Sequence, residues 1–301
     1  MNEKLKIVFG YVIISLIWGS TWLAIRLGLD SLTPLIASGL RFLVASLFIY
    51  IFMKYKNVEL QKDSKSIKLY YFLGIFSYFI PFGLVYWAEQ FVPSGLASVI
   101  FATFPFMVMF FTYLFLKSEV IDKFKFLGAF SGFLGIYFIF SDEINIDLNL
   151  QLWGMVAILA SSTLQAISAV TIKKYGKHLN PLSMNFVPVL IGGIFLTLSG
   201  LSVEDLSKLS FDQKAVVSVI YLAFFGTLIS FTIYYWLLKK INIVILSLSS
   251  FITPIIAIFL GWIILSEKLD NNDIIGSVFV LIGLVIANFG GLMNFSKSFR
   301  N

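Results

Sequence analysis

The chain has 301 residues, of which 59% are hydrophobic and only 13% are charged. A soluble domain carries about twice that charged fraction and has no core large enough to bury so much apolar surface, so an ordinary soluble protein is excluded. The sequence has no cysteine and a single histidine, His178, which leaves almost no side chains for disulfides, zinc sites or Ser/His catalysis.

A membrane-spanning helix needs roughly 20 mainly apolar residues, and ten segments of the chain qualify. In chain order these segments are Ile7–Ile25, Pro34–Met53, Leu69–Ala88, Ser94–Leu116, Phe124–Phe140, Leu152–Ile172, Leu182–Leu201, Ala215–Leu238, Ile241–Leu265 and Ile274–Met293. The first is too long for the core of a signal peptide and no clear cleavage site follows it, so we expect it to be retained. The sequence predicts an all-α polytopic membrane protein with ten transmembrane helices.

Basic residues are distributed unevenly among the joints between these segments. With the N-terminus in the cytoplasm, most of the 22 lysines and arginines lie in cytoplasmic joints, and the outer joints hold only Arg26, Lys208, Lys214 and Lys268. This positive-inside bias predicts that both termini are cytoplasmic. It also explains the net charge of +6 without nucleic acid as a partner.

The second half of the chain repeats residues of the first half in the same order and at nearly the same spacing. The two series are Tyr86-Trp87, Ser98, Pro105, Glu119, Gly128, Gly135 and Tyr235-Trp236, Ser247, Pro254, Glu267, Gly276, Gly283. We therefore predict two repeats, residues 1–141 and 142–301, each with five helices. Because five is odd, the second repeat would enter the membrane inverted, which is an architecture of transporters.

The repeated prolines, Pro105 and Pro254, lie near the middle of their segments. Proline removes a backbone donor and frees a carbonyl one turn back. Matched breaks in matched helices indicate a binding region near the middle of the membrane. The alternative is that both prolines only kink their helices for packing.

Several short motifs, in this order and spacing, resemble the EamA family of the drug/metabolite transporter (DMT) superfamily over nearly the whole chain. They are Trp18-Gly19-Ser20-Thr21-Trp22, Ile25-Arg26-Leu27-Gly28, Arg41-Phe42, Ala88-Glu89-Gln90, Pro93-Ser94-Gly95-Leu96-Ala97-Ser98, Ser118-Glu119 and Ser266-Glu267. The resemblance implies a ten-helix carrier of small organic metabolites, often an exporter. It also implies that the first to fourth and sixth to ninth helices surround a central cavity.

The chain departs from an exact repeat in two places. One extra residue separates Pro105 from Glu119, and Ser162 and Ala166 stand where the first helix has Trp18 and Trp22. The two halves of the cavity are therefore expected to differ chemically.

Arg41 is the sharpest candidate site residue, because an arginine within a membrane helix is costly and needs a partner. All sixteen acidic residues lie at segment ends or in joints, and Glu89 is the nearest by depth. Either Arg41 has a structural or gating role, bound to Glu89 or to carbonyls freed by the prolines, or it binds the carboxylate or phosphate of a substrate. Its guanidinium fork suits both.

The absence of a carboxylate from the first helix disfavours an exchanger of cationic drugs for protons. We expect either no tight proton coupling or coupling through Glu89.

The other candidate residues for substrate binding or the transport pathway are aromatic, small and polar, or helix-breaking. With Arg41 and Glu89 they are Trp18, Ser20, Thr21, Trp22, Thr103, Pro105, Gln165, Ser247, Ser249 and Pro254. Tryptophan and tyrosine also favour membrane interfaces, and small polar groups also join helices, so each has a structural alternative. Glu119 and Glu267 are expected to stabilise the N-termini of the helices that they precede.

These features favour a secondary transporter of a small organic metabolite, an amino acid or derivative, exported across the plasma membrane of a bacterium. The alternatives are a nucleobase or nucleoside carrier of the same fold and a membrane-embedded lipid-modifying enzyme. An enzyme or a channel would need clustered acids, a metal or a pore loop, none of which the sequence displays. We expect a small-molecule substrate, the lipid bilayer as surroundings, no cofactor or metal, and leave a homodimer open.

Overall fold

A computed structural model describes residues 2–116, 123–141, 150–268 and 270–287 of the chain. These residues form helices and connecting turns, without a strand. In chain order the elements are α1 (Glu3–Gly28), α2 (Pro34–Tyr55), α3 (Ser64–Leu73), η1 (Gly74–Phe79), α4 (Ile80–Ala88), α5 (Ser94–Phe101), α6 (Phe104–Leu116), α7 (Lys123–Ser141), α8 (Leu150–Tyr175), α9 (Pro181–Val203), η2 (Leu206–Lys208), α10 (Gln213–Ala223), η3 (Phe224–Ile229), α11 (Ser230–Lys240), α12 (Ile243–Ser247), η4 (Leu248–Phe251), α13 (Ile252–Leu265) and α14 (Asn271–Ala287).

Eight helical stretches in the described part of the chain are long and apolar enough to cross a membrane. They are Glu3–Gly28, Pro34–Tyr55, Ser64–Ala88, Ser94–Leu116, Leu150–Tyr175, Pro181–Val203, Gln213–Lys240 and Ile243–Leu265. Each overlaps one of the segments expected from the sequence, and α7 and α14 occupy the remaining two. The all-α polytopic membrane class is therefore confirmed, whereas ten crossings and an inverted second half stay predictions.

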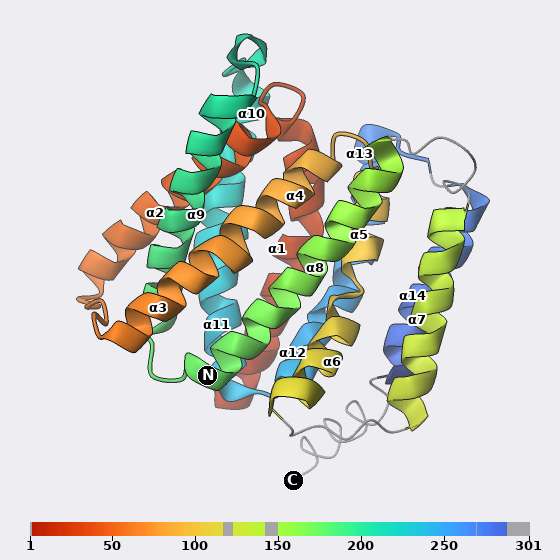
Figure 1. Ribbon diagram of the computed structural model, residues 1–301, viewed down its shortest axis with the longest axis horizontal. Helices are drawn as coiled ribbons and strands as arrows, with labels where there is room; N and C mark the ends of the chain where they lie inside the picture. The colour runs from red at the N-terminus through yellow and green to blue at the C-terminus, as the bar shows by residue number, and fades with distance from the viewer. Residues whose placement is uncertain (1, 117–122, 142–149, 269, 288–301) are drawn as a thin grey trace.

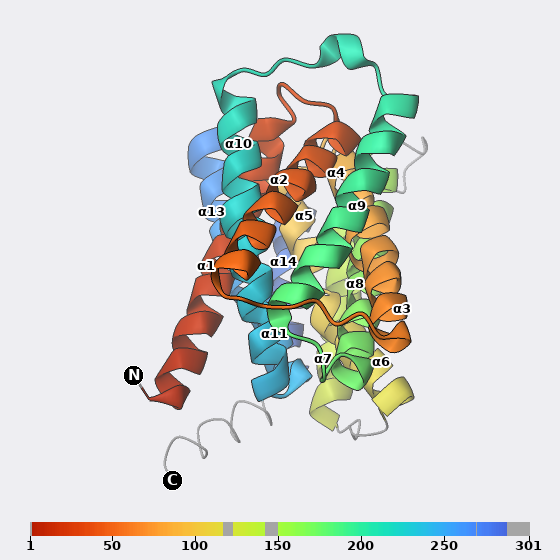
Figure 2. The ribbon, with the colours of Figure 1, turned by 90° about the vertical axis from the view of Figure 1, so that its left-hand side faces the viewer.

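The helices run side by side as one bundle (Figures 1 and 2), and Figure 1 shows the pair α7 and α14 at its edge. The most extensive contacts join α7 to α14, α2 to α9, α4 to α8 and α1 to α13. All four pairs take one helix from each half of the sequence. The bundle is therefore built by interleaving the two halves.

Two of the long stretches are broken near the repeated prolines. Between α5 and α6 the α-helix is interrupted at Ala102 and Thr103, and Pro105 is the second residue of α6. In the other half the 3₁₀ turn η4 separates α12 from α13, and Pro254 is the third residue of α13. Each proline thus lies in the first turn after a break, where its missing N–H costs little.

Two other long stretches contain a π-helical turn. η1 interrupts the stretch from α3 to α4, and η3 interrupts the stretch from α10 to α11. Such turns often mark functional sites, because they alter the usual pattern of backbone hydrogen bonds.

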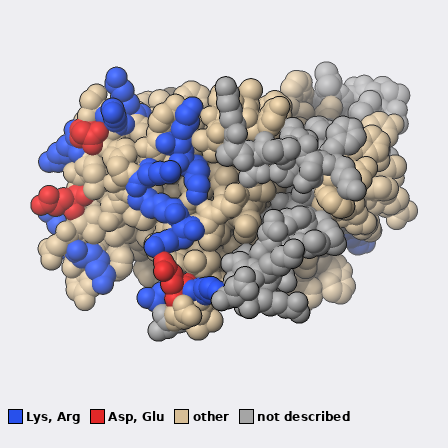
Figure 3. All heavy atoms as spheres, turned by 90° about the horizontal axis from the view of Figure 1, so that it is seen from below, with Lys and Arg blue, Asp and Glu red and all other residues tan. Residues whose placement is uncertain are grey.

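The two ends of the bundle differ in charge. We call the end at the start of α1 the lysine-rich end, and Figure 3 shows it from below. There Lys240 Nζ lies 2.8 Å from Glu3 Oε1, and Lys173 Nζ donates to two backbone carbonyls near the end of α11 at 2.6 and 2.8 Å. At the opposite end, which we call the acidic end, Lys214 Nζ lies 3.2 Å from Asp30 Oδ2.

Candidate functional site

A cavity of about 110 Å³ lies inside the bundle, between helices from both halves of the chain. Its lining comes from α1, α2, η1, α4, α5, α6 and α8 and from α11, η4 and α13. Aromatic and aliphatic side chains predominate, with a few polar groups among them. A mostly apolar cavity with a few placed polar groups is typical of small-molecule sites.

Five of the candidate residues predicted from the sequence line this cavity together: Trp18, Thr21, Trp22, Arg41 and Gln165. The Trp18 indole N–H donates to the Ser230 hydroxyl at 3.0 Å, and its ring lies 5.3 Å from that of Tyr234. The Trp22 ring meets Phe101 edge-on at 5.5 Å. The tryptophans of α1 therefore form part of the aromatic wall.

The broken helices contribute matched positions to the cavity. Phe101 and Ser250 each stand three residues after a repeated serine, and Phe104 and Thr253 each precede a repeated proline. All four line the cavity. The first half thus presents two aromatic rings where the second half presents two hydroxyl groups, in line with the expected chemical difference between the halves.

Arg41 is buried in the cavity wall, with 2% of its surface exposed. Its Nε donates to Thr227 Oγ1 at 3.1 Å, its Nη2 to the Gly226 carbonyl at 3.0 Å, and its Nη1 to Tyr86 Oη at a longer 3.4 Å. Gly226 and Thr227 belong to the π-helical turn η3. The sequence suggested Glu89 or proline-freed carbonyls as structural partners, and the structure instead gives Arg41 a carbonyl from a π-helical turn.

The positive charge of Arg41 has no carboxylate partner among the described residues, since none of their ion pairs includes it. A guanidinium carries five N–H donors, and the three bonds above leave two of them for another acceptor. The faces of Phe82 and Phe42 lie 5.0 and 5.2 Å from the guanidinium carbon and stabilise the cation in part. The cavity wall therefore holds a charge that an anionic group would complement.

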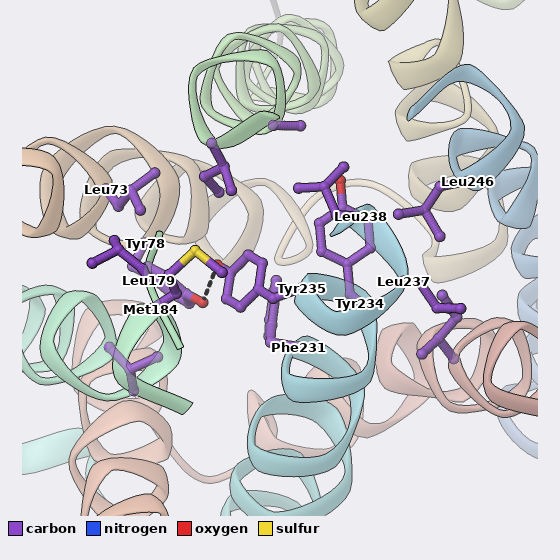
Figure 4. Close-up of a cluster of buried hydrophobic side chains, with 14 of the residues drawn as sticks. Leu73, Tyr78, Leu179, Met184, Phe231, Tyr234, Tyr235, Leu237, Leu238 and Leu246 are labelled. Carbon is purple, nitrogen blue, oxygen red and sulfur yellow. Dashed lines mark hydrogen bonds between the residues drawn. The ribbon is translucent and has the colours of Figure 1, made fainter. Parts of the chain in front are cut away.

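A chain of buried hydroxyl and amide groups continues beyond Arg41 and its π-helical turn. Asn185 donates to the Thr227 carbonyl at 3.2 Å and accepts from the Tyr78 hydroxyl at 3.3 Å. The Tyr78 and Tyr235 hydroxyls lie 2.7 Å apart, as the dashed line in Figure 4 marks. Tyr235, one of the repeated tyrosines, brings this chain to the cavity surface.

Gln165 forms a second polar point on the wall. Its Oε1 accepts from the Ser77 hydroxyl at 3.3 Å, and both residues line the cavity. Ser77 belongs to η1, so both π-helical turns contribute to the site or to its support.

The remaining candidate residues do not line the cavity. Ser20 lies 2.6 Å from the Tyr221 hydroxyl in a separate groove, and the Thr103 hydroxyl lies 3.0 Å from that of Ser162. The hydroxyls of Ser247 and Ser249 donate to carbonyls three residues earlier in their own segment. Pro105 and Pro254 lie beside the lining positions Phe104 and Thr253.

Glu89 directly follows the span that ends at Ala88, at the acidic end, and is completely buried. Neither carboxyl oxygen has a hydrogen-bond partner. Arg26 Nη1 donates to the backbone carbonyl of Glu89 at 3.2 Å and not to its side chain. Burial, with a smaller contribution from the negative charge of Glu267, raises the pKa of the Glu89 carboxyl well above its usual value.

Two other carboxylates at the acidic end bind helix N-termini that are distant in sequence. Glu204 accepts from the backbone N–H groups of Leu35 and Ile36 at the start of α2, at 2.7 and 3.1 Å. Glu267 accepts from those of Ser94 and Gly95 at the start of α5, at 2.9 and 3.1 Å. The expected stabilisation of a helix N-terminus is thus present for Glu267, but on α5 and not on the helix that follows it. Glu119 lies outside the described residues.

The structure also places in the cavity residues that sequence analysis did not select, notably Phe82, Phe231, Ser250 and Thr253. The repeat held a signal for the last two, because they flank positions that were recognised as matched. Phe82 and Phe231 are ordinary aromatic residues in apolar segments, and nothing in the sequence separates them from lipid-facing ones. The described residues contain no group of acidic, histidine or cysteine side chains that would hold a metal ion.

Comparison with known proteins gives a consistent family. The model of the EamA-like transporter family matches residues 5–141 and 152–289. The uncharacterized transporter YoaV of Bacillus subtilis (strain 168) is 29% identical, over 94% of this chain and 97% of that protein. Protein PagO of Salmonella typhimurium is 28% identical over 95% and 93%. The uncharacterized inner membrane transporter YedA of Escherichia coli (strain K12) is 28% identical over 91% and 88%.

A solved crystal structure shares the fold, with a TM-score of 0.72 and 15% identity over 96% of this chain and 98% of the other. The family match takes in most of the sequence in two copies and confirms the resemblance drawn from the motifs. This multi-pass membrane protein belongs to the EamA-like transporter family.

Proposed function

We propose that this membrane transporter carries a small organic molecule with a carboxylate group, an amino acid or a derivative, out of a bacterial cell. The observation that carries the substrate class is the Arg41 guanidinium in the cavity wall, which has no carboxylate partner among the described residues. Within a low-dielectric site a carboxylate would form charge-assisted bonds with the two remaining N–H donors. The choice of efflux follows the family resemblance.

Transport by alternating access between two inverted repeats is the mechanism that we propose. It is supported by the repeated sequence series, by the two broken helices and by the matched positions that each contributes to one cavity. Two related half-sites around one cavity suit a site that opens to either side in turn. The domain limits, residues 1–141 and 142–301, belong to the same proposal.

The orientation in the membrane follows from charge. Lysines gather at the end where α1 begins, so we place this end and the N-terminus in the cytoplasm (Figure 3).

The experiment that tests the substrate class is counterflow in proteoliposomes loaded with a mixed pool of amino acids, organic acids and nucleosides. Mass spectrometry of the exchanged pool identifies the substrate. We expect selective exchange of compounds with a carboxylate. Arg41→Gln should weaken the affinity for them by about 10- to 100-fold, because a hydrogen bond to a charged group contributes about 1.5–3 kcal/mol.

Two controls separate charge from structure. The methyl ester of the exchanged compound lacks the negative charge and should be affected little by Arg41→Gln. Thr227→Val removes one hydrogen bond of Arg41 without removing its charge, and should leave the preference for the acid over the ester intact. Unchanged affinity of Arg41→Gln for the acid would contradict the proposal.

The second candidate is a nucleobase or nucleoside carrier, favoured by the rings of Trp18, Trp22 and Phe101 in the cavity wall. A flat substrate would stack on them. Exchange of nucleosides that is insensitive to Arg41→Gln would select this candidate. The enzyme alternative has no supporting observation in the described residues.

A further inference from the structure

Glu89 stands out because it is a buried acidic side chain that the cavity does not use. It has no exposed surface, and both carboxyl oxygens lack a hydrogen-bond partner. Two other acids at the same end of the bundle, Glu204 and Glu267, each accept two backbone N–H groups. Glu89 therefore differs from other acids of this end in having nothing to stabilise a negative charge by direct hydrogen bonds.

The charged groups around Glu89 come from three elements. Arg26 on α1 donates to the backbone carbonyl of Glu89. Arg41 on α2 and Glu267, in the segment after α13, act on the Glu89 carboxyl group through their charges. The charged residues of α8, which packs against α4, are Lys173 and Lys174 at the lysine-rich end.

Burying a carboxylate without hydrogen bonds costs far more free energy than burying a neutral carboxylic acid. A second negative charge nearby adds to that cost. Glu267 supplies that charge, and its carboxylate accepts two backbone N–H groups at the start of α5. The conformation described here therefore suits a protonated Glu89.

Tyr86 stands between Glu89 and the cavity-lining Arg41. Tyr86 lies one helical turn before Glu89, on the same face of this segment, and its hydroxyl accepts from Arg41. The side-chain oxygen of Ser94, at the start of α5, is also buried and without a hydrogen-bond partner, and Ser94 lies beside Glu267. The packing around Glu89 thus lies between the wall of the cavity and the acidic end of the bundle.

We propose that Glu89 is a proton-binding site that couples proton movement to opening of the acidic end of the cavity. This inference rests on the proposed transport function and adds its coupling ion. Glu89 carries a proton while the acidic end is closed around it. When this end opens, water reaches the carboxyl group, which releases H⁺ to water and becomes a hydrated carboxylate.

The sign of the pH effect follows. Protons bind better to the closed form than to the open form, so low pH favours closure of the acidic end. As the pH rises, the closed form loses this advantage and the open form gains population. A single coupled proton changes the ratio of the two forms by up to about tenfold per pH unit.

The test uses single cysteines, because the chain has none of its own. Ile25→Cys places a thiol in the cavity one residue before Arg26, near the acidic end, and Ile172→Cys places one beside Lys173, near the lysine-rich end. Each cysteine variant is made in four backgrounds, namely the unchanged chain, Glu89→Gln, Glu89→Asp and Glu204→Gln, and is reconstituted in proteoliposomes. An impermeant thiol reagent is applied from the side of the acidic end, without substrate, between pH 5 and pH 8.

Between pH 5 and pH 8 we expect the labelling rate of Ile25→Cys to increase when Glu89 is present. This increase should be at least about fivefold larger than the increase in the Glu89→Gln background. The comparison at one cysteine cancels the pH dependence of the thiol itself. Glu89→Asp and Glu204→Gln should keep the pH response, because the first keeps an acid and the second changes an acid that is already hydrogen-bonded. Labelling of Ile172→Cys from this side should follow the same pattern, because this residue lines the same cavity.

The proposal would be overturned if labelling of Ile25→Cys responded to pH equally with Glu89 and with Glu89→Gln. It would also be overturned if labelling did not respond to pH when Glu89 is present. Because no substrate is present, the outcome does not depend on which compound is carried. A pH-dependent response lost in Glu89→Gln, together with failed exchange of carboxylates, would support the proton site and reject the proposed substrate class.

Discussion

Two tyrosines whose hydroxyls lie 2.7 Å apart have different positions relative to the cavity. Tyr235 lines the cavity, whereas Tyr78 lies behind it and also donates to Asn185. Asn185 in turn bonds the carbonyl of Thr227, whose hydroxyl accepts from Arg41. At the scale of single residues, Tyr78 therefore supports the geometry of Arg41, and Tyr235 presents a polar group toward a bound molecule.

The matched substitutions Tyr78→Phe and Tyr235→Phe test this division. Tyr78→Phe removes two buried hydrogen bonds and should destabilise the protein by about 1–3 kcal/mol. A loss of this size lowers the thermal midpoint by several degrees, about 2–4 °C per kcal/mol. Tyr235→Phe should lower the midpoint less and change the KM for exchange more. Thermal unfolding in detergent measures the midpoint, and counterflow kinetics measure the KM. Equal effects of the two substitutions on both quantities would contradict the different roles assigned to Tyr78 and Tyr235.

At the scale of helices, the sequence predicted much of the fold because long apolar segments have few alternatives in a membrane. The predicted segment Pro34–Met53 differs from α2 only in its last two residues. The π-helical turns η1 and η3 were not predicted, since inserting such a turn leaves the hydropathy pattern unchanged. Two of the three partners of Arg41, Gly226 and Thr227, lie in η3, so they were missed for the same reason.

The contact of Glu267 with α5 also depends on local backbone geometry. Ser266 has a positive φ of 54°, unusual for a residue other than glycine, and ends α13 with a turn. This turn lets the Glu267 N–H bond the Gly261 carbonyl at 3.1 Å and directs its side chain to the N-terminus of α5. From the sequence, Ser266-Glu267 before a helix predicts that Glu267 stabilises the N-terminus of that next helix. The contact of Glu267 with the distant helix α5 was therefore not predicted.

The repeated glycines of α7 and α14 make the contact between these helices close. A Cβ atom at Gly135 would lie 2.5 Å from the Gly276 carbonyl oxygen, and one at Gly283 would lie 2.5 Å from that of Gly128. Each glycine of one series thus meets the opposite member of the other series. Such crossed pairing is what two helices related by a two-fold axis would give.

Gly135→Val should therefore separate α7 from α14. Overpacking of this kind costs about 1–3 kcal/mol and should lower the thermal midpoint by several degrees. The KM for exchange should stay within about twofold, because neither helix contributes to the cavity lining. Ile282→Val, on the exposed face of α14, is the control and should change neither quantity. A raised KM with an unchanged midpoint would place α7 in the transport pathway instead.

At the scale of the whole molecule, the two repeats predict the side of the membrane on which each joint lies. This prediction does not depend on the helix contacts or on the cavity. The joint between α2 and α3 and the joint between α9 and α10 occupy equivalent places in the two halves of the chain. If the second half is inverted, these equivalent joints must face opposite sides of the membrane. If both halves have the same orientation, they must face the same side.

Exposed positions are available in both joints for this test: Lys65 at the start of α3 and Ser207 in η2. Since the chain has no cysteine, Lys65→Cys and Ser207→Cys each provide a single reactive thiol. In intact cells an impermeant maleimide should label Ser207→Cys and leave Lys65→Cys unlabelled until the membrane is permeabilised. Labelling of both positions from one side would contradict the inversion, and with it alternating access by inverted repeats. Labelling of Lys65→Cys alone would keep the inversion but place the lysine-rich end outside, against the charge bias that oriented the molecule.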